Sequence, residues 1–178
     1  MPDEPKTHPD AAPPIDLDLR SRNTTEPMTQ NMKRFNIFLI DTGWNRPISR
    51  VVRSHVRGLF EIGGYHAQDS LYELTPLQSA EILKRDPQLI GCDPTIIVYD
   101  LYGCHRADAG NYCGFRLNLG LMKHRDQALA RLQEFVRFLA INRTAERLDK
   151  EVRRELHREG IEGIVKILRE TSVDLLME

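Results

Sequence analysis

Three cysteines and one histidine are the side chains best suited to chemistry in this chain. Cys104 and His105 are followed shortly by Cys113, and Cys92 lies upstream. Structural zinc sites take four ligands, commonly from paired short cysteine spacings. The chain has no Cys-x-x-Cys pair, and a fourth ligand would need to come from Cys92, His66 or His124, so we expect no metal site and keep zinc as an alternative.

The same cysteines suggest a second chemistry, in which Cys104 and Cys113 are a candidate redox pair. They would form a reversible disulfide if a hairpin brought their Cα atoms within about 7 Å. The alternative is that both thiols pack as small hydrophobic groups. An odd number of cysteines in a cytosolic chain favours thiols over a fixed disulfide framework.

Composition and motifs exclude several classes of function. The formal net charge is −1, so we expect neither a nucleic-acid partner nor an anionic membrane partner. No apolar stretch approaches the roughly 20 residues that span a bilayer, and the start of the chain lacks the features of a secretory signal. The expected location is therefore the cytoplasm. With no phosphate loop, dinucleotide fingerprint or recognisable triad, we expect no cofactor.

Apolar periodicity predicts alternating strands and helices from residue 35 onward. The predicted strands are 35–40, 70–74, 95–101 and 112–119, and the predicted helices are 47–60, 76–86 and 125–141. Pro47 and Pro76 suit the first turn of a helix. Thr75 and Gln78 have the spacing of a capping box, and Gly114 suggests a bulge.

The regions outside these elements differ in composition. Residues 1–32 are rich in proline and predicted to be a disordered tail, with Ile15-Asp-Leu-Asp-Leu19 as a candidate docking motif. Residues 33–142 form the predicted domain. Residues 143–178 combine a narrow apolar stripe with a second apolar face around Ile164 and Leu168, so we expect a C-terminal helical hairpin. Such a hairpin would dock on the domain or form a homo-oligomer.

The element order predicts an α/β fold, with a parallel strand pair, an antiparallel hairpin added to the same sheet, and helices on both faces. Trp44-Asn45-Arg46-Pro47-Ile48 heads the first helix, and Asp93-Pro94-Thr95 precedes the third strand. Together these features resemble the thioredoxin superfamily. The resemblance covers roughly residues 34–142 and implies a thioredoxin-like three-layer α/β/α sandwich with a mixed central sheet, and a cis peptide bond at Pro94.

The departures from the superfamily pattern concern the two catalytic cysteines. Asn45 stands where the attacking cysteine is expected, and Ile48 stands where the resolving cysteine is expected. Dithiol exchange needs a thiolate and a second sulfur. The resemblance therefore implies a protein without dithiol oxidoreductase activity. Redox-inactive members that bind partners include the circadian-clock KaiB family, to which the segments Pro87-Gln-Leu89 and Asp93-Pro-Thr95 are similar.

The implied site is a vestigial active-site surface, made by Trp44, Asn45, Arg46, Pro47, Ile48, Asp93 and Pro94. A basic stripe on the first helix adjoins it, formed by Arg46, Arg50, Arg53 and Arg57. We interpret this stripe as a candidate contact for an acidic protein partner, the alternative being a solvated face. A further hypothesis is that Arg46 pairs with Asp93.

The leading hypothesis is a non-catalytic interaction or assembly module. The first alternative is a thiol-dependent redox protein or sensor that uses Cys104 and Cys113. The second is ligand binding like that of glutathione transferases, where the backbone before the cis proline holds the peptide.

Overall fold

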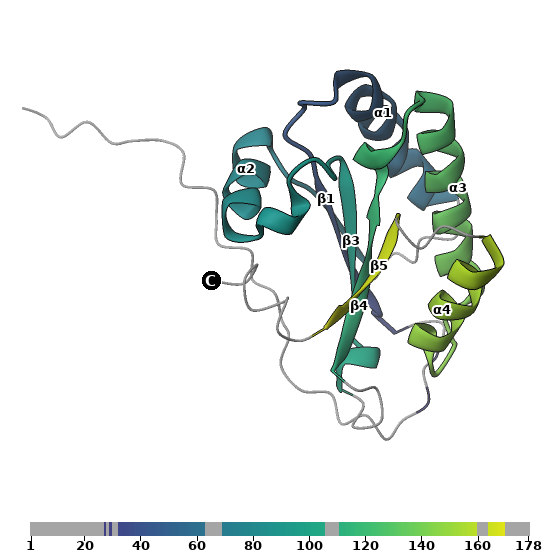
Figure 1. The fold of residues 1–178 in the computed structure, drawn as a ribbon. Coiled ribbons are helices and arrows are strands. Elements are labelled where there is room, and N and C mark those ends of the chain that lie inside the picture. The colour runs from purple at the N-terminus through teal and green to yellow at the C-terminus, as the bar shows by residue number, and fades with distance from the viewer. Residues whose placement is uncertain are drawn as a thin grey trace, which may run out of the picture.

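The structure is a computed structural model that describes residues 27, 29, 32–62, 69–105, 111–159 and 164–169. Within these ranges a mixed five-stranded sheet is flanked by four helices (Figure 1). The strands are β1 (Phe35–Ile40), β2 (Ser70–Glu73), β3 (Thr95–Asp100), β4 (Tyr112–Asn118) and β5 (Val165–Arg169). The helices are α1 (Arg46–Ile62), α2 (Pro76–Arg85), α3 (Arg125–Ile141) and α4 (Leu148–Glu159). Three short 3-10 helices, η1 (Pro87–Leu89), η2 (Gly103–His105) and η3 (Leu119–Leu121), join them.

The sheet has the strand order β2-β1-β3-β4-β5. β1 and β2 are parallel, while β3, β4 and β5 each run antiparallel to the strand before them in this order. The predicted parallel pair and the predicted hairpin in one sheet are confirmed. The capping box of Thr75 and Gln78 is also confirmed, as is the irregularity at Gly114, where the β4–β5 register shifts.

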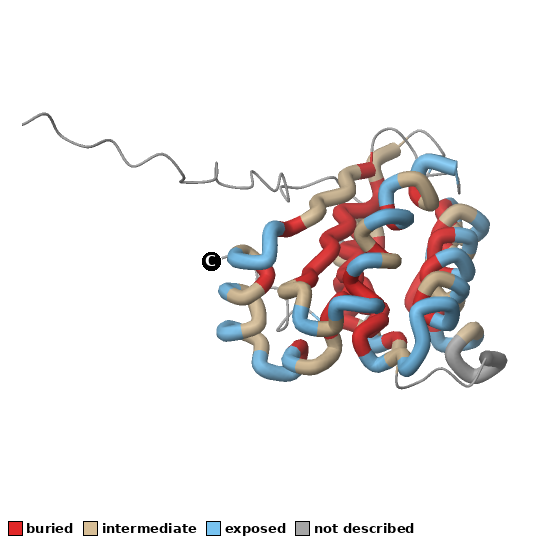
Figure 2. Tube along the Cα trace, turned by 90° about the horizontal axis from the view of Figure 1, so that it is seen from above, coloured by how far each residue is buried: buried red, intermediate tan, exposed pale blue. Residues whose placement is uncertain are grey.

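Two apolar clusters lie on opposite faces of the sheet. The larger one joins alternate residues of the strands to α1, α3 and α4, and includes Leu39, Val98, Phe115, Val52 and Leu132. The smaller cluster includes Phe38, Ile40, Ile97 and Tyr99, packed beneath α2 and η1. Seen from above, the buried sheet lies between helices whose outer sides are exposed (Figure 2). The three central strands β1, β3 and β4 are buried throughout because both faces are covered, while the outer strands β2 and β5 are only partly buried.

The predicted C-terminal helical hairpin is wrong in its second half. α4 is a helix, but residues 165–169 form β5, which pairs with β4 along the edge of the sheet. Val165 is buried in the larger cluster and Leu168 in the smaller one, so their side chains lie on opposite faces of the sheet. Val165 and Leu168 are three residues apart, which is also the spacing of one face of a helix, and this led to the wrong prediction. The predicted segments 1–26 and 170–178 lie outside the described residues.

Candidate functional site

The cis-proline end of the sheet, where β1 ends and β3 begins, holds the predicted vestigial surface. The peptide bond between Asp93 and Pro94 is cis, as the resemblance implied. The Trp44 indole donates through Nε1 to the Asp93 carbonyl at 2.9 Å. Asn45 donates through its amide to the Gly120 carbonyl at 3.3 Å, and the Gly120 N–H donates to the Pro94 carbonyl at 3.0 Å. The structure thus brings Trp44, Asn45 and Pro94 together.

Close backbone packing fixes this end of the sheet. A Cβ atom added at Gly120 would lie 2.1 Å from the Asp93 carbonyl oxygen and 2.6 Å from that of Cys92. Only glycine fits there without displacing the segment before the cis proline. The second alternative assigned peptide binding to the backbone before the cis proline, and the Asp93 carbonyl there already accepts a hydrogen bond from the Trp44 indole.

Asp93 is almost fully buried and does not pair with Arg46. Its Oδ2 accepts from the Thr42 backbone N–H at 3.0 Å and from the Thr42 hydroxyl at 2.5 Å. Its Oδ1 has no hydrogen-bond partner. Arg46 is exposed, and no ion pair joins it to Asp93 among the described contacts. The hypothesis of an Arg46–Asp93 pair therefore does not hold in this structure.

The basic stripe divides into two arginines that form ion pairs within the domain and two that form none with the described residues. Arg53 donates to the buried Asp41 carboxylate at 2.6 Å and also to the Asp41 and Leu74 carbonyls. Arg57 pairs with Glu73 at 2.6 Å. These two side chains tie α1 to the end of β1 and to β2. Arg46 and Arg50 remain exposed and form no ion pair with another described residue.

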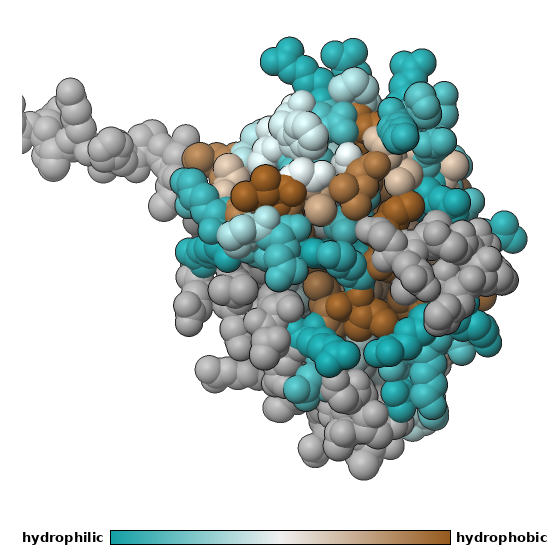
Figure 3. Space-filling model, viewed as in Figure 1, coloured by the Kyte–Doolittle hydropathy of each residue, from teal (hydrophilic) through white to brown (hydrophobic). Residues whose placement is uncertain are grey.

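Exposed apolar side chains lie on the segments next to the cis proline. Trp44 is 59% exposed, Ile90 65% and Leu121 47%. Leu121 follows Gly120, which contacts the Cys92 and Pro94 carbonyls, so it lies close to the cis proline. In Figure 3 the hydrophobic colour gathers in a band between α2 and α3, at this end of the sheet. Scattered exposed apolar residues are ordinary, but a grouped set beside cations that form no ion pair with the described residues is typical of a contact surface.

The candidate redox pair lies at the other end of the sheet. The Cys104 thiol donates to the Cys113 carbonyl at 3.0 Å, and both residues are thiols rather than a disulfide. A hydrogen bond with the Cys113 side chain, followed by burial, raises the pKa of the Cys104 thiol. Because the thiolate is the reactive form, this environment suppresses nucleophilic chemistry at Cys104. The thiols are adjacent, as a hairpin would require, but not activated.

The same end holds a buried ion network that the sequence did not reveal. Arg34 and Asp100, both fully buried, form a bidentate pair with two contacts of 3.0 Å. Arg143 pairs with Asp69, and the Arg34 guanidinium also donates to the Arg143 carbonyl. Asp69 accepts the backbone N–H groups of Arg34 and Phe35 at 2.8 and 2.9 Å. Arg34 and Asp100 lie at the ends of strongly apolar strands, and this position was the feature of the sequence that could have indicated a buried ion pair.

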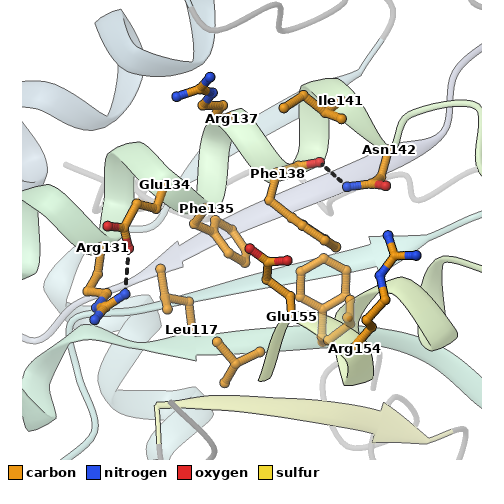
Figure 4. A pocket seen from close by; sticks show the side chains of 13 residues that line it. Leu117, Arg131, Glu134, Phe135, Arg137, Phe138, Ile141, Asn142, Arg154 and Glu155 are labelled. Atoms are coloured by element: carbon orange, nitrogen blue, oxygen red, sulfur yellow. Dashed lines mark hydrogen bonds and ion pairs between the residues drawn. The ribbon is translucent and has the colours of Figure 1, made fainter. Parts of the chain in front are cut away.

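A pocket of about 490 Å³ opens between α3, α4 and the sheet (Figure 4). Its apolar side includes Phe115, Leu117, Phe135, Phe138, Val152 and Val165. Polar side chains line the rest, among them Arg131, Glu134, Arg137, Asn142, Arg154 and Glu155. Its size is within the range of ligand and peptide sites. Sequence reasoning missed this pocket because it depends on how α4 packs.

Neither metal binding nor membrane insertion gains support from the described residues. Within them no group of three or more His, Cys, Asp or Glu side chains is arranged to hold a metal ion. Every helix in the same ranges is too short or too polar to cross a bilayer. No protein-family model, curated protein or solved structure matches the chain significantly.

Proposed function

We propose that this chain is a non-catalytic, thioredoxin-like interaction module that binds an acidic protein partner at the cis-proline end of its sheet. The observation that carries the proposal is the arrangement there: Trp44 is exposed against the Asp93 carbonyl, beside Arg46 and Arg50, which have no acidic partner in the described residues. Neither Asn45 nor Ile48 supplies sulfur there. Asn45, just before α1, donates to the Gly120 carbonyl, whereas Ile48 is buried in the core and does not belong to the predicted surface.

The chemistry of the surface defines the partner. Trp44 and Leu121 favour an apolar side chain, and the two arginines favour carboxylates next to it. Asp93 is buried and accepts hydrogen bonds from Thr42, so its carboxylate is not itself a contact for such a partner. An acidic segment with one or two apolar residues is therefore the partner class that this end fits best.

Quantitative capture from the native cell tests the proposal. The wild type, Trp44→Ala and Ile62→Ala would be immobilised in turn, since Ile62 is 88% exposed at the far end of α1 and provides a matched control. We expect a specific acidic protein to be retained by the wild type and the control and lost with Trp44→Ala. Equal retention by all three would contradict the proposal.

A second candidate is a thiol redox function, favoured by the contact of Cys104 with Cys113. The step would be oxidation of both thiols by a peroxide, which forms the S–S bond, releases two protons and two electrons, and reduces the peroxide to water. Mass spectrometry after mild peroxide treatment would show a loss of two hydrogens localised to these cysteines. The interaction module predicts no such specific loss.

A further inference from the structure

We propose that the pocket between α3 and α4 binds a segment of this same chain, Ile15-Asp-Leu-Asp-Leu19. This inference is independent of the proposed function, because it concerns a different face of the molecule. The pocket combines an aromatic and aliphatic side with a charged rim (Figure 4). The segment alternates apolar and acidic residues, so an extended conformation would turn three apolar side chains one way and two carboxylates the other.

The apolar side of the pocket provides the contact for Ile15, Leu17 and Leu19. Phe115 packs edge-to-face against Phe135 and Phe138, with ring centroids 5.4 and 6.3 Å apart. From α4, Val152 lines this apolar side, and Leu148 belongs to the same buried cluster. In Figure 4 the rings of Phe135 and Phe138 point toward the sheet, with the Glu155 carboxylate beside them. Arg131 and Arg154 lie on either side, and Arg137 extends away from the rings.

The rim suits the two aspartates. Arg131, Arg137 and Arg154 line the pocket. Glu134 is engaged by Arg131 at 2.6 Å, and Arg154 also pairs with Glu151. Arg137 is exposed and forms no ion pair with any other described residue, so it is a cation available to Asp16 or Asp18. Carboxylates of the segment would extend these ion pairs into a network.

The chain geometry makes the contact reachable. Arg143 donates to the Met32 carbonyl at 2.7 Å, so Met32 lies beside the residue that follows Asn142, which lines the pocket. The residues between Leu19 and Met32 can span up to roughly 45 Å. The pocket wall from Arg131 to Asn142 is about 16 Å long from the helical rise, and five extended residues cover about 13 Å. Linker and groove therefore match the segment in length.

Native trypsin cleavage after Arg20 tests the proposal in the full chain, because Arg20 follows Leu19 directly and Lys6 provides an internal reference site. An effective concentration of about 1 mM and a peptide Kd of about 0.1 mM would slow cleavage after Arg20 about tenfold. We expect Ile141→Asp, at a pocket residue that is 68% exposed, to abolish this protection. Ile62→Asp, at a site that is 88% exposed and outside the pocket, should retain it.

Two further experiments test whether residues 15–19 of the same chain occupy the pocket. Trypsin should cleave the variant carrying both Leu17→Asp and Leu19→Asp after Arg20 at the same rate as it cleaves Ile141→Asp. The segment then lacks two of its apolar side chains. Protection should persist when the protein is diluted a hundredfold. Equal cleavage rates in the wild type, Ile141→Asp and Ile62→Asp would overturn the proposal. Protection lost on dilution would also overturn it, since the pocket would then hold the segment of a second copy.

Discussion

The two ends of the central strands differ in how many of their charged residues are paired. At the ion-pair end, Arg34, Asp69, Asp100 and Arg143 are buried and satisfy one another. At the cis-proline end, Arg53 pairs with the buried Asp41, but among the described residues Asp93 is buried without a cation, and Arg46 and Arg50 face solvent. The Asp93 Oδ1 and Asn118 Nδ2 atoms there have no hydrogen-bond partner. At the ion-pair end the charged groups pair with one another, whereas at the cis-proline end Trp44, Arg46 and Arg50 are exposed to solvent.

This difference separates residues that hold the fold from residues that can recognise a partner. A buried ion pair is costly to break because the remaining charge stays desolvated. An exposed arginine contributes little to stability but can contribute strongly to binding. The comparison therefore predicts large losses of stability from changes at the ion-pair end and small ones from surface changes at the cis-proline end.

The largest effect should follow from Arg34→Ala. The substitution leaves Asp100 buried without its bidentate partner and removes a donor to the Arg143 carbonyl. We expect the free energy of unfolding to fall by about 3–5 kcal/mol, measured by urea denaturation. Arg50→Ala, at an exposed site on α1, should change it by less than about 0.5 kcal/mol. Comparable losses in both variants would remove the contrast between the two ends.

Gly120→Ala should have the next largest effect and tests how tightly the cis-proline end is packed. The new Cβ would lie 2.1 Å from the Asp93 carbonyl oxygen, which forces the backbone apart and costs about 1–3 kcal/mol. Gly58→Ala, inside α1 with no neighbour within 4 Å, is the control and should stabilise the chain by about 0.5–1 kcal/mol. Thermal unfolding of both variants measures the difference, and a neutral Gly120→Ala would disprove the close packing.

The cysteines should differ in alkylation rate between the two ends. The pKa of the Cys104 thiol is raised by its contact with Cys113 and by burial, so this thiol stays protonated through the physiological range. Cys92, partly exposed beside the cis proline, should react with iodoacetamide at least about tenfold faster at pH 8. The rate at Cys104 should still rise about tenfold per pH unit near pH 9. A rate at Cys104 that levels off near pH 7 would instead indicate an activated thiol.

The smallest effect should follow from Tyr99→Phe. The Tyr99 hydroxyl is buried and has no hydrogen-bond partner, while burial raises its pKa and keeps it neutral. Removing an unpaired buried hydroxyl should leave stability unchanged or increase it by up to about 1 kcal/mol. A clear loss of stability in urea would show that this hydroxyl is satisfied in solution.

The sequence predicted those features that depend on local patterns. The first four strands and the capping box follow from apolar runs, proline positions and short spacings, whereas the cis Pro94 was implied by the resemblance to the thioredoxin superfamily. β5 was missed because its buried residues lie on opposite faces of the sheet, which removes the alternation that identifies a strand. The ion network and the pocket join residues far apart in the chain, so no local pattern specifies them.

Binding of the captured acidic partner to the variant carrying both Arg46→Glu and Arg50→Glu is the most direct test of the central claim. Both arginines are exposed and unpaired among the described residues, so the double variant should unfold at the same urea concentration as the wild type. We predict that it nevertheless binds the partner at least about tenfold more weakly. Unchanged affinity in the folded double variant would contradict the assignment of the cis-proline end as the contact surface.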